Sequence, residues 1–359
     1  MLAPAISSFA ISLLIVLTSK WHGRHSYDTN EGVQKFHTSP TPRIGGLAMF
    51  PALIVAALLL PQASGALLNS LIIAAIPAFS AGLIEDFTKK VSVRNRLLAT
   101  MVSGLCAWWL TGYSLNRIEV IGIDVLLAWL PVSVSFTTFA VAGIANATNI
   151  IDGFNGLASG TVMICFGAFA MIAAEVGDLV LMQLCIALII VIAGFFLLNF
   201  PFGKLFMGDG GAYLLGFLLA WVAVMLPMRN AGISKWSSLL VCSYPIIETL
   251  FSMARRYWNK SHPGQPDSEH LHSLIKVKLV RRYFHFLPQS LRNGLVSPFC
   301  WIFAVATSSI AVMHYGSKPV LITAGVAALV LYAAVHGLLM RSGSGRDAGA
   351  GSHAPLTGD

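Results

Sequence analysis

Asn146-Ala-Thr-Asn-Ile-Ile-Asp-Gly-Phe-Asn-Gly-Leu-Ala-Ser-Gly160 is a polar, glycine-rich stretch between two segments that are each apolar enough to cross a bilayer. It places Asn149, Asp152 and Asn155 at three-residue spacing. Polar side chains at a membrane edge cost free energy unless they line a wet cavity or hold a ligand, so they indicate a functional site. The spacing predicts that the three side chains lie along one side of a helical turn. A polar hinge between two helices is the alternative, although a hinge needs no acid flanked by two amides.

The composition of the whole chain predicts an all-α polytopic membrane protein. Of 359 residues, 56% are hydrophobic and only 11% are charged, and the mean hydropathy of +0.75 lies outside the range of soluble globular domains. All five cysteines fall in apolar stretches without a Cys-x-x-Cys pair, which indicates small buried or lipid-facing side chains. The net charge of +8 would suit nucleic acid, but this charge gathers on one side of the predicted membrane, so we expect no nucleic-acid partner.

About eleven apolar segments are long enough to be transmembrane helices. They lie near 2–19, 44–60, 66–84, 97–112, 130–146, 156–174, 179–198, 211–227, 236–254, 296–314 and 319–340. The first has no basic residue ahead of it and is followed at once by Lys20 and Arg24. This order is the reverse of a cleavable signal peptide. We therefore expect a first spanning helix with its N-terminus outside.

The distribution of basic residues tests this topology, because cytoplasmic loops carry the excess of Lys and Arg. With the N-terminus outside, 19 of the 23 basic residues fall in cytoplasmic segments, and the exceptions are Arg117, Arg229, Lys235 and Lys318. The count supports eleven spans and a cytoplasmic C-terminus. Residues 1–340 are predicted to form one membrane domain. Residues 341–359, rich in Gly, Ser and Ala, cannot pack a core and are expected to form a flexible cytoplasmic tail.

The same topology places every polar, glycine-rich cluster on the cytoplasmic side. These clusters are Pro40-Thr-Pro-Arg-Ile-Gly-Gly46, Glu85-Asp86, the stretch quoted above, Phe206-Met-Gly-Asp-Gly-Gly211 and Pro266-Asp-Ser-Glu-His-Leu-His272. Such a one-sided collection suits an enzyme that joins a soluble anion to a lipid. A transporter or flippase for a lipid-linked sugar is the rival interpretation, but transporters concentrate polar residues near the bilayer midplane.

The acids in these clusters admit more than one role. Asp209 lies between glycines at the start of an apolar span, where helix N-terminal amides would suit a metal-bound phosphate; an N-cap is the alternative. Glu85 and Asp86, close to Arg96, could bind Mg²⁺, accept a proton or form solvated ion pairs.

The histidines near the last long loop are a second ambiguous group. His270 and His272 form a weak zinc motif without nearby cysteine, whereas Arg255 and Arg256 on the same segment favour phosphate contacts. Glu248 lies seven residues before Arg255, on the same helical side, and is expected to form an ion pair within its helix.

Five ordered motifs together resemble the polyprenyl-phosphate N-acetylhexosamine-1-phosphate transferases. They are Pro40–Gly46, Glu85-Asp86 with Ser92–Arg96, Asn149–Leu157, Phe206–Asp209 and His270–His272. That family includes the enzymes initiating O-antigen, enterobacterial common antigen and teichoic acid synthesis, and the phospho-N-acetylmuramoyl-pentapeptide translocase. The resemblance covers nearly the whole chain except the tail.

The resemblance implies a role for ten residues. Asn149 and Asp209 would hold Mg²⁺, with Mn²⁺ as an alternative ion. Arg96 would meet the lipid phosphate, Asp152 and Asn155 would face the nucleotide sugar, and the two histidines would contact its pyrophosphate or sugar. The catalytic set would be Glu85, Asp86 and Asp152, and the substrate-binding set Arg43, Arg96, Asn155, His270 and His272. This chain departs from the family at Glu85, usually Asp, at Asn155, often Asp, and at Ser273, often His.

The implied activity is transfer of N-acetylhexosamine-1-phosphate, with N-acetylglucosamine the first expectation, from a UDP-sugar to undecaprenyl phosphate, releasing UMP. It would take place at the cytoplasmic face of the bacterial inner membrane, as the first step of O-antigen (lipopolysaccharide) or other cell-envelope polysaccharide synthesis. The loop from His262 to Ser273 resembles that of the O-antigen and teichoic acid branch, with the pentapeptide translocase as the alternative. A homodimer is left open.

Overall fold

The structure is a computed structural model that describes residues 2–27, 40–260, 267 and 269–341. Within these residues the chain is helical, and its one β-type feature is an isolated antiparallel bridge between Tyr27 and Pro42. Residues 342–359 of the predicted tail, and residues 262–266 and 268 of the predicted loop, lie outside the described residues.

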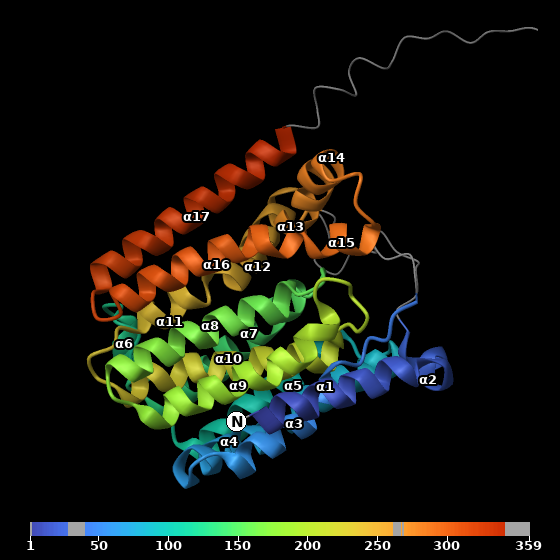
Figure 1. The fold of residues 1–359 in the computed structure, drawn as a ribbon. Helices are drawn as coiled ribbons and strands as arrows, with labels where there is room; N and C mark the ends of the chain where they lie inside the picture. The colour runs from blue at the N-terminus through green and yellow to red at the C-terminus, as the bar shows by residue number, and fades with distance from the viewer. Residues whose placement is uncertain (1, 28–39, 261–266, 268, 342–359) are drawn as a thin grey trace, which may run out of the picture.

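The helices carry the labels of Figure 1. They are α1 (Leu2–Leu17), α2 (Ser19–Ser26), α3 (Gly46–Leu59), α4 (Gln62–Thr88), α5 (Val93–Thr111), α6 (Ile123–Leu127), α7 (Leu130–Ile150), α8 (Leu157–Glu175), α9 (Leu179–Asn199), α10 (Gly208–Arg229), α11 (Lys235–Val241), α12 (Ser243–Trp258), α13 (Leu271–Leu274), the π-helix η1 (Ile275–Val280), α14 (Arg281–Tyr283), α15 (Gln289–Gly294), α16 (Val296–Met313) and α17 (Lys318–Arg341).

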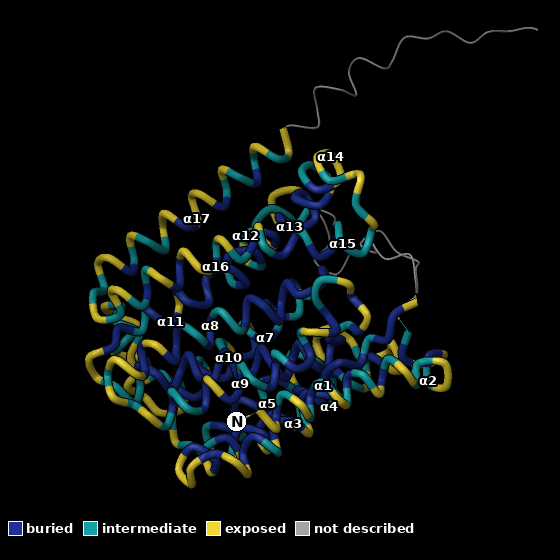
Figure 2. The backbone as a smooth tube through the Cα atoms, viewed as in Figure 1, coloured by how far each residue is buried: buried dark blue, intermediate teal, exposed yellow. Residues whose placement is uncertain are grey.

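Helix α10 forms the centre of the bundle. Every residue from Gly208 to Pro227 is buried, as expected for a helix that is apolar on all sides. Helices α3, α4, α7 and α8 pack around it. Helix α17 lies at the opposite extreme, at one edge of the bundle, and exposes most of its surface (Figure 2). An apolar helix surface exposed in this way faces lipid in a membrane protein.

The predicted multi-pass helical architecture is confirmed, but the count of eleven spans is not reproduced. Among the described residues, seven helices are long and apolar enough to cross a membrane, or up to nine if the bent pairs α1–α2 and α11–α12 are single spans. The predicted segments 44–60 and 97–112 are helical. However, α3 has only 14 residues, and α5 starts with the polar run Arg94-Asn-Arg96. The orientation of the termini stays a prediction.

The two ends of the bundle carry different polar clusters. One end, on the right in Figure 1, contains α13 to α15, the α7–α8 turn and the start of α10. At the opposite end, Asp178 caps α9 by accepting from the Leu181 amide at 3.1 Å. Asp178 also forms a two-point ion pair with Arg229, with Nε···Oδ2 2.6 Å and Nη2···Oδ1 2.9 Å. This second cluster ties the end of α10 to the start of α9.

Candidate active site

Asp86, near the end of α4, caps the N-terminus of α10. One carboxylate oxygen accepts from the Asp209 amide at 2.7 Å and the other from the Gly210 amide at 2.8 Å. The side chain is 1% exposed. Glycines make this approach feasible: Gly208 has φ +75°, and a Cβ on it would lie 2.6 Å from Asp86 Oδ2. The carboxylate therefore neutralises the positive end of the α10 dipole and satisfies two amides that have no partner inside the helix.

Asp209 does not cap its own helix, so the predicted N-cap alternative is not what the structure contains. Its carboxylate, 1% exposed, forms ion pairs with Arg43 and Arg96. Arg43 Nε also lies 3.8 Å from Asp86. Two guanidinium groups and two carboxylates from separate parts of the chain thus meet at the start of α10.

Backbone hydrogen bonds hold Arg43 in this position. The segment from Pro42 to Gly46 runs beside the segment before α10, because the Phe206 amide donates to the Pro42 carbonyl at 2.9 Å and the Gly45 and Gly46 amides donate to Phe206 and Met207. Gly46 also packs so closely on α10 that a Cβ would lie 2.5 Å from the Gly211 nitrogen. The Pro-Arg-Ile-Gly-Gly segment is therefore held against the start of α10, and this contact places Arg43 beside Asp209.

Arg96 reaches Asp209 from the first turn of α5. Ser92 caps this helix by accepting from the Asn95 amide at 3.2 Å. The Arg96 guanidinium lies 5.8 Å from the ring centroid of Tyr213, a cation–π distance. Tyr213 is one turn after Asp209 on α10, so the ion pair and the aromatic ring together orient the arginine.

The adjacent acids Glu85 and Asp86 point to different partners. Glu85 Oε2 accepts from the Val91 amide at 2.6 Å, across the connection between α4 and α5. Asp86 instead faces α10. The structure thus gives the first acid a role in the turn that precedes Arg96 and brings the second acid alone to Asp209.

The prediction that Asn149, Asp152 and Asn155 share one helical side is wrong. Helix α7 ends at Ile150 and α8 begins at Leu157, so Asn149 lies in a last helical turn and the other two in the connecting turn. Gly156 adopts φ +77° and its amide donates to Asn199 Oδ1 at 2.7 Å. This left-handed glycine reverses the chain, and periodicity could not anticipate it.

Asn155 is buried by three separate segments. Its Nδ2 donates to the Pro201 carbonyl at 2.9 Å and to the Ser290 carbonyl at 3.3 Å. Its backbone carbonyl accepts from Ser297 Oγ at 2.7 Å. The side-chain Oδ1 is buried and has no hydrogen-bond partner among the described residues. Buried acceptors are rarely left unpaired, which marks this oxygen as a candidate ligand contact.

Asp152 lies in the same turn, within the electrostatic reach of Arg43 and Asp86. Burial of the carboxylate raises the pKa of Asp152 to about 8, the charge of Arg43 opposes the rise, and the charge of Asp86 adds to it. The side chain keeps some solvent exposure. Asp152 can therefore hold a proton near neutral pH and lose it when a cation approaches.

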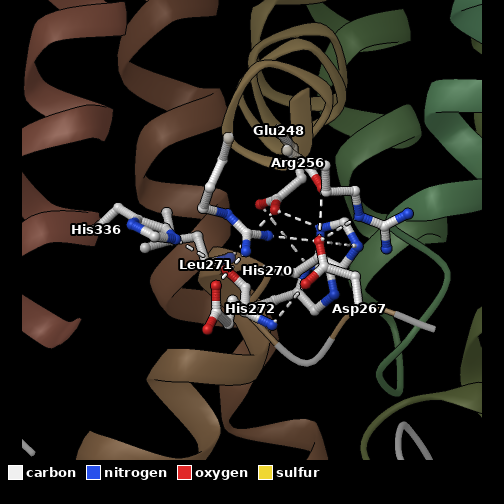
Figure 3. A network of polar contacts seen from close by, with 10 residues as sticks. Glu248, Arg256, Asp267, His270, Leu271, His272 and His336 are labelled. Carbon is white, nitrogen blue, oxygen red and sulfur yellow. Dashed lines mark hydrogen bonds and ion pairs between the residues drawn. The ribbon is translucent and has the colours of Figure 1, made fainter. Parts of the chain in front are cut away.

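Glu248 organises the two predicted histidines (Figure 3). Its Oε1 lies 3.0 Å from His270 Nδ1 and accepts from the Leu271 amide at 3.1 Å. Its Oε2 lies 3.7 Å from His272 Nδ1. The two imidazoles stack, with centroids 5.1 Å apart. The predicted ion pair within α12 is wrong, because Glu248 pairs with the loop and Arg255 pairs with Asp267 and Glu269.

Asp267 anchors the other side of this loop. It accepts from Ser252 Oγ at 2.6 Å and pairs with Arg255 and, at 3.2 Å, with Arg256. Burial alone would raise the pKa of Asp267, but the hydrogen bonds from Ser252 and the Glu269 amide and the charges of His270 and Arg255 bring it down to about 2. The carboxylate is thus ionised at neutral pH. Two of the arginines expected to bind phosphate are already neutralised by the loop's own acids.

His272 connects the loop to the glycine-rich turn. Its ring centroid lies 5.6 Å from that of Phe154, and a Cβ on Gly153 would lie 3.4 Å from its Nε2. From the other side, α17 supports the loop, since His336 Nε2 lies 2.8 Å from the Glu269 carbonyl oxygen. The histidines and the Asp152 turn therefore border the same site.

The predicted metal ligands Asn149 and Asp209 lie on α7 and α10, two helices that pack against each other. Tyr213 Oη donates to Asn146 Oδ1 at 2.8 Å. Asp209 precedes Tyr213 by one turn of α10, and Asn149 follows Asn146 by about one turn of α7. Amide and carboxylate oxygens are donors that Mg²⁺ prefers, so this pair fits Mg²⁺ chemically. Among the described residues no three His, Cys, Asp or Glu side chains form a cluster that could hold a metal.

Sequence reasoning missed Tyr213 and Asn199, and it assigned the wrong partner to Glu248. Glu248 binds His270 and lies within ion-pair distance of His272, Tyr213 supports Arg96 and Asn146, and Asn199 binds the Gly156 turn. Each is a polar residue in an apolar span, and that rarity was the available signal. Their partners lie far away in sequence.

Comparison with known proteins gives the family. A model described as glycosyl transferase family 4 matches residues 68–227. The chain is 28% identical over 247 residues to the undecaprenyl-phosphate alpha-N-acetylglucosaminyl 1-phosphate transferase of Yersinia pestis, covering 67% of each chain. It is 28% identical over 257 residues to the Escherichia coli (strain K12) protein of that name, again 67% of each.

A relative with a different named activity matches a larger share of both chains than these two. The chain is 32% identical over 273 residues to the phospho-N-acetylmuramoyl-pentapeptide-transferase of Lacticaseibacillus paracasei, which covers 69% of this chain and 81% of that one. The family match contains Asp86, Arg96, the glycine-rich turn and Asp209. This multi-pass membrane protein belongs to glycosyl transferase family 4.

Proposed function

We propose that this protein transfers N-acetylhexosamine-1-phosphate from a UDP-sugar to undecaprenyl phosphate and releases UMP. The observation that carries the proposal is the meeting of Arg43, Arg96 and Asp209 beside the turn that holds Asp152. In the proposed reaction an oxygen of the lipid phosphate attacks the phosphorus that bears the sugar, and the bond from that phosphorus to UMP breaks. Family membership supports this class of reaction.

The two arginines would supply positive charge to phosphate oxygens. Phosphoryl transfer needs alignment and charge neutralisation more than covalent help from the protein, and a guanidinium binds phosphate with two parallel hydrogen bonds. Asp209 keeps both arginines in place before substrate arrives. Arg96, at the start of α5, would meet the lipid phosphate, and Arg43 would meet the donor.

The turn and the histidine loop would bind the nucleotide sugar. Asn155 offers a buried oxygen without a described partner. His270 and His272 would donate to the pyrophosphate or sugar, and Glu248 orients them for this task. Asp152 would hold a proton while the site is empty and release it when cationic charge gathers around the donor.

Mg²⁺, or Mn²⁺ in its place, would be held by Asp209 and Asn149. When bound, the ion would neutralise charge on the phosphates and help to align them. The protein would contribute one oxygen from Asp209 on α10 and one from Asn149 on α7.

N-acetylglucosamine is the first expectation for the sugar, with the product entering O-antigen or another cell-envelope polysaccharide. The named activity of the Yersinia pestis relative supports this choice. A pentapeptide-bearing muramoyl donor is the second candidate, since the Lacticaseibacillus paracasei relative matches a larger share of both chains. The site would face the cytoplasm of the inner membrane, as the excess of Lys and Arg in the predicted internal segments favours.

An exchange assay tests the reaction class. Purified protein in detergent is mixed with radiolabelled UMP, unlabelled UDP-N-acetylglucosamine, undecaprenyl phosphate and Mg²⁺, and label is followed into the UDP-sugar. We expect label exchange. A lipid-linked sugar transporter would give none, because detergent leaves no compartments and a transporter breaks no bond. A panel with the UDP-muramoyl-pentapeptide as donor then separates the two candidate substrates.

A further inference from the structure

Lys276 is a fully buried lysine that the proposed reaction does not use. It lies in η1, only 1% exposed, four residues after His272. Its Nζ donates to Asn293 Oδ1 on α15, and Asn293 is also 1% exposed. A buried ammonium costs free energy that a hydrophobic side chain of similar volume would not. A role in stability alone would be served better by methionine or leucine.

The charges around Lys276 add to the free-energy cost of burying its ammonium group. Burial first, and then the charges of Arg292 and Arg281, lower the pKa of Lys276 to about 7. Among the described residues no carboxylate pairs with Lys276, so its hydrogen bond to Asn293 is made in a repulsive electrostatic environment. The charged groups that face it come from α14 and α15.

Asn293 connects Lys276 to the glycine-rich turn. Helix α15 also contains Ser290, whose carbonyl accepts from Asn155 Nδ2 at 3.3 Å. Gly294, next to Asn293, packs on the carbonyl of Pro201, where a Cβ would come within 2.7 Å. The same Pro201 carbonyl accepts from Asn155 Nδ2 at 2.9 Å. Helix α15 therefore forms one wall of the pocket that orients the Asn155 carboxamide.

Lys276 also belongs to the segment that contains His272. Helix α13 and η1 follow each other without a break from Leu271 to Val280. In this segment His272 contacts the turn at Gly153 and Phe154, while Lys276 contacts α15. The segment thus touches the turn directly at one point and through α15 at another.

We propose that Lys276 is a positioning residue for the nucleotide sugar, which through Asn293 holds α15 and the Asn155 carboxamide at a set distance from His272. This inference rests on the proposed function, because it assigns Asn155 and His272 to the donor. Lys276 itself need not touch the substrate.

Kinetics of Lys276→Met test the proposal, because methionine keeps the length of the side chain without its charge or donor. We expect the KM for the UDP-sugar to rise about tenfold, as a lost positioning hydrogen bond shifts affinity by about that factor. The KM for undecaprenyl phosphate and kcat should change less than about threefold on the same scale. Lys278→Met, two residues away on the same helical segment, is the matched control and should leave all three constants unchanged.

Two further variants separate this role from packing. Asn293→Leu should reproduce the donor KM of Lys276→Met, and the double variant should be no worse than either single one, because the two residues act as one link. Asn293→Asp should keep the KM near that of the wild type, since a carboxylate still accepts from the ammonium. The proposal would be overturned if the increases in donor KM of the two single variants added in the double variant. It would also be overturned if the KM values for the UDP-sugar and for undecaprenyl phosphate rose equally.

Hydrogen exchange of the substrate-free protein gives a readout independent of the reaction. Amides of residues 151–156 should exchange faster in Lys276→Met, while those of residues 93–100 on α5 should not change. Unchanged exchange in the turn would overturn the link even if activity fell. If the wild type instead shows this link but transfers no sugar phosphate from any UDP-sugar, the proposed function fails and the link stands.

Discussion

Asp86 caps the helix that carries Asp209, and it does so with both carboxylate oxygens, at 2.7 and 2.8 Å from the amides of Asp209 and Gly210. The two acids lie 123 residues apart in the chain. Because Asp86 satisfies the amides at the start of α10, the Asp209 side chain is released to pair with Arg43 and Arg96. Asp86 thus has a structural role, and this role leaves the Asp209 carboxylate available to the active site.

Asp86→Asn should damage both the fold and the reaction. A carboxamide can accept one of the two amide hydrogen bonds but turns a donor toward the other, which should cost about 1–3 kcal/mol of stability. Thermal unfolding and initial rates measure the two effects, and we expect activity to fall at least about tenfold.

Glu85→Gln is the contrasting variant. Glu85 accepts from the Val91 amide with one oxygen, and glutamine retains an acceptor. A phosphate monoester with a second pKa near 6 is mostly dianionic at neutral pH, so little proton removal is required. We expect substantial activity at pH 8. A pH–rate profile of both variants from pH 6 to 9 is the measurement, and complete loss in Glu85→Gln with donor binding intact would assign proton transfer or metal ligation to Glu85.

Asp209→Asn should lower turnover at least about tenfold, equivalent to about 1.4 kcal/mol in the barrier, while the protein stays folded. Arg43 keeps 32% of its side chain exposed and can turn to water when its partner loses charge. Asp178→Asn is the matched control, since it also breaks a buried pair with an arginine, but at the far end of α10. That variant should lower the melting temperature and leave the activity per folded molecule unchanged. Similar turnover losses in both would contradict a specific role for Asp209.

Glu248→Gln should raise the donor KM about tenfold. The acceptor that orients His270 is weakened and the negative charge beside His272 is removed, so both imidazoles are held less firmly. Glu269→Gln, whose carboxylate is 39% exposed and pairs with Arg255 on the same loop, should change the KM less than about twofold. Steady-state kinetics with varied UDP-sugar distinguish the two, and equal effects would reduce Glu248 to general support of the loop.

Asp152 should make the stability of the wild type depend on pH. Its folded-state pKa, about 8, is above the ordinary value of 3.8, so the folded protein retains a proton that the unfolded chain loses. The stabilisation is fully present below about pH 4 and is lost as pH rises through 8. Partial solvent exposure keeps the effect modest. The melting temperature of the wild type minus that of Asp152→Asn should therefore decrease from pH 5 to pH 9. A constant difference would refute this prediction.

Asn149→Ala should raise the Mg²⁺ concentration needed for half-maximal activity about tenfold, as loss of a metal contact typically does. At saturating Mg²⁺ the rate should recover. Chelation should abolish the activity of the wild type, with recovery on adding Mg²⁺ or Mn²⁺. Activity that persists through exhaustive chelation would remove the metal assignment of both Asn149 and Asp209.

The sequence by itself determined the helical segments and which residues deserved attention. A long run of apolar residues indicates a helix that is buried in protein or lipid. Each of the eleven predicted segments is helical in the structure. Asn149, Asp152 and Asn155 stood out because polar groups are costly in such surroundings, and Asp209 stood out because it lies between glycines at the start of an apolar span. These conclusions depend only on local composition and spacing.

Only the tertiary structure decided which residues meet. The chain reverses after Ile150 at a turn held by Asn199, and Glu248 pairs with His270 rather than with Arg255. Both features depend on contacts between distant segments. The pairing of Lys276 with Asn293 is of the same kind. Periodicity reports which side of a helix is apolar but not which helix will cover it. Partner choice is settled by the packing of glycine-lined surfaces such as Gly46 and Gly82 against α10, and no local pattern contains that information.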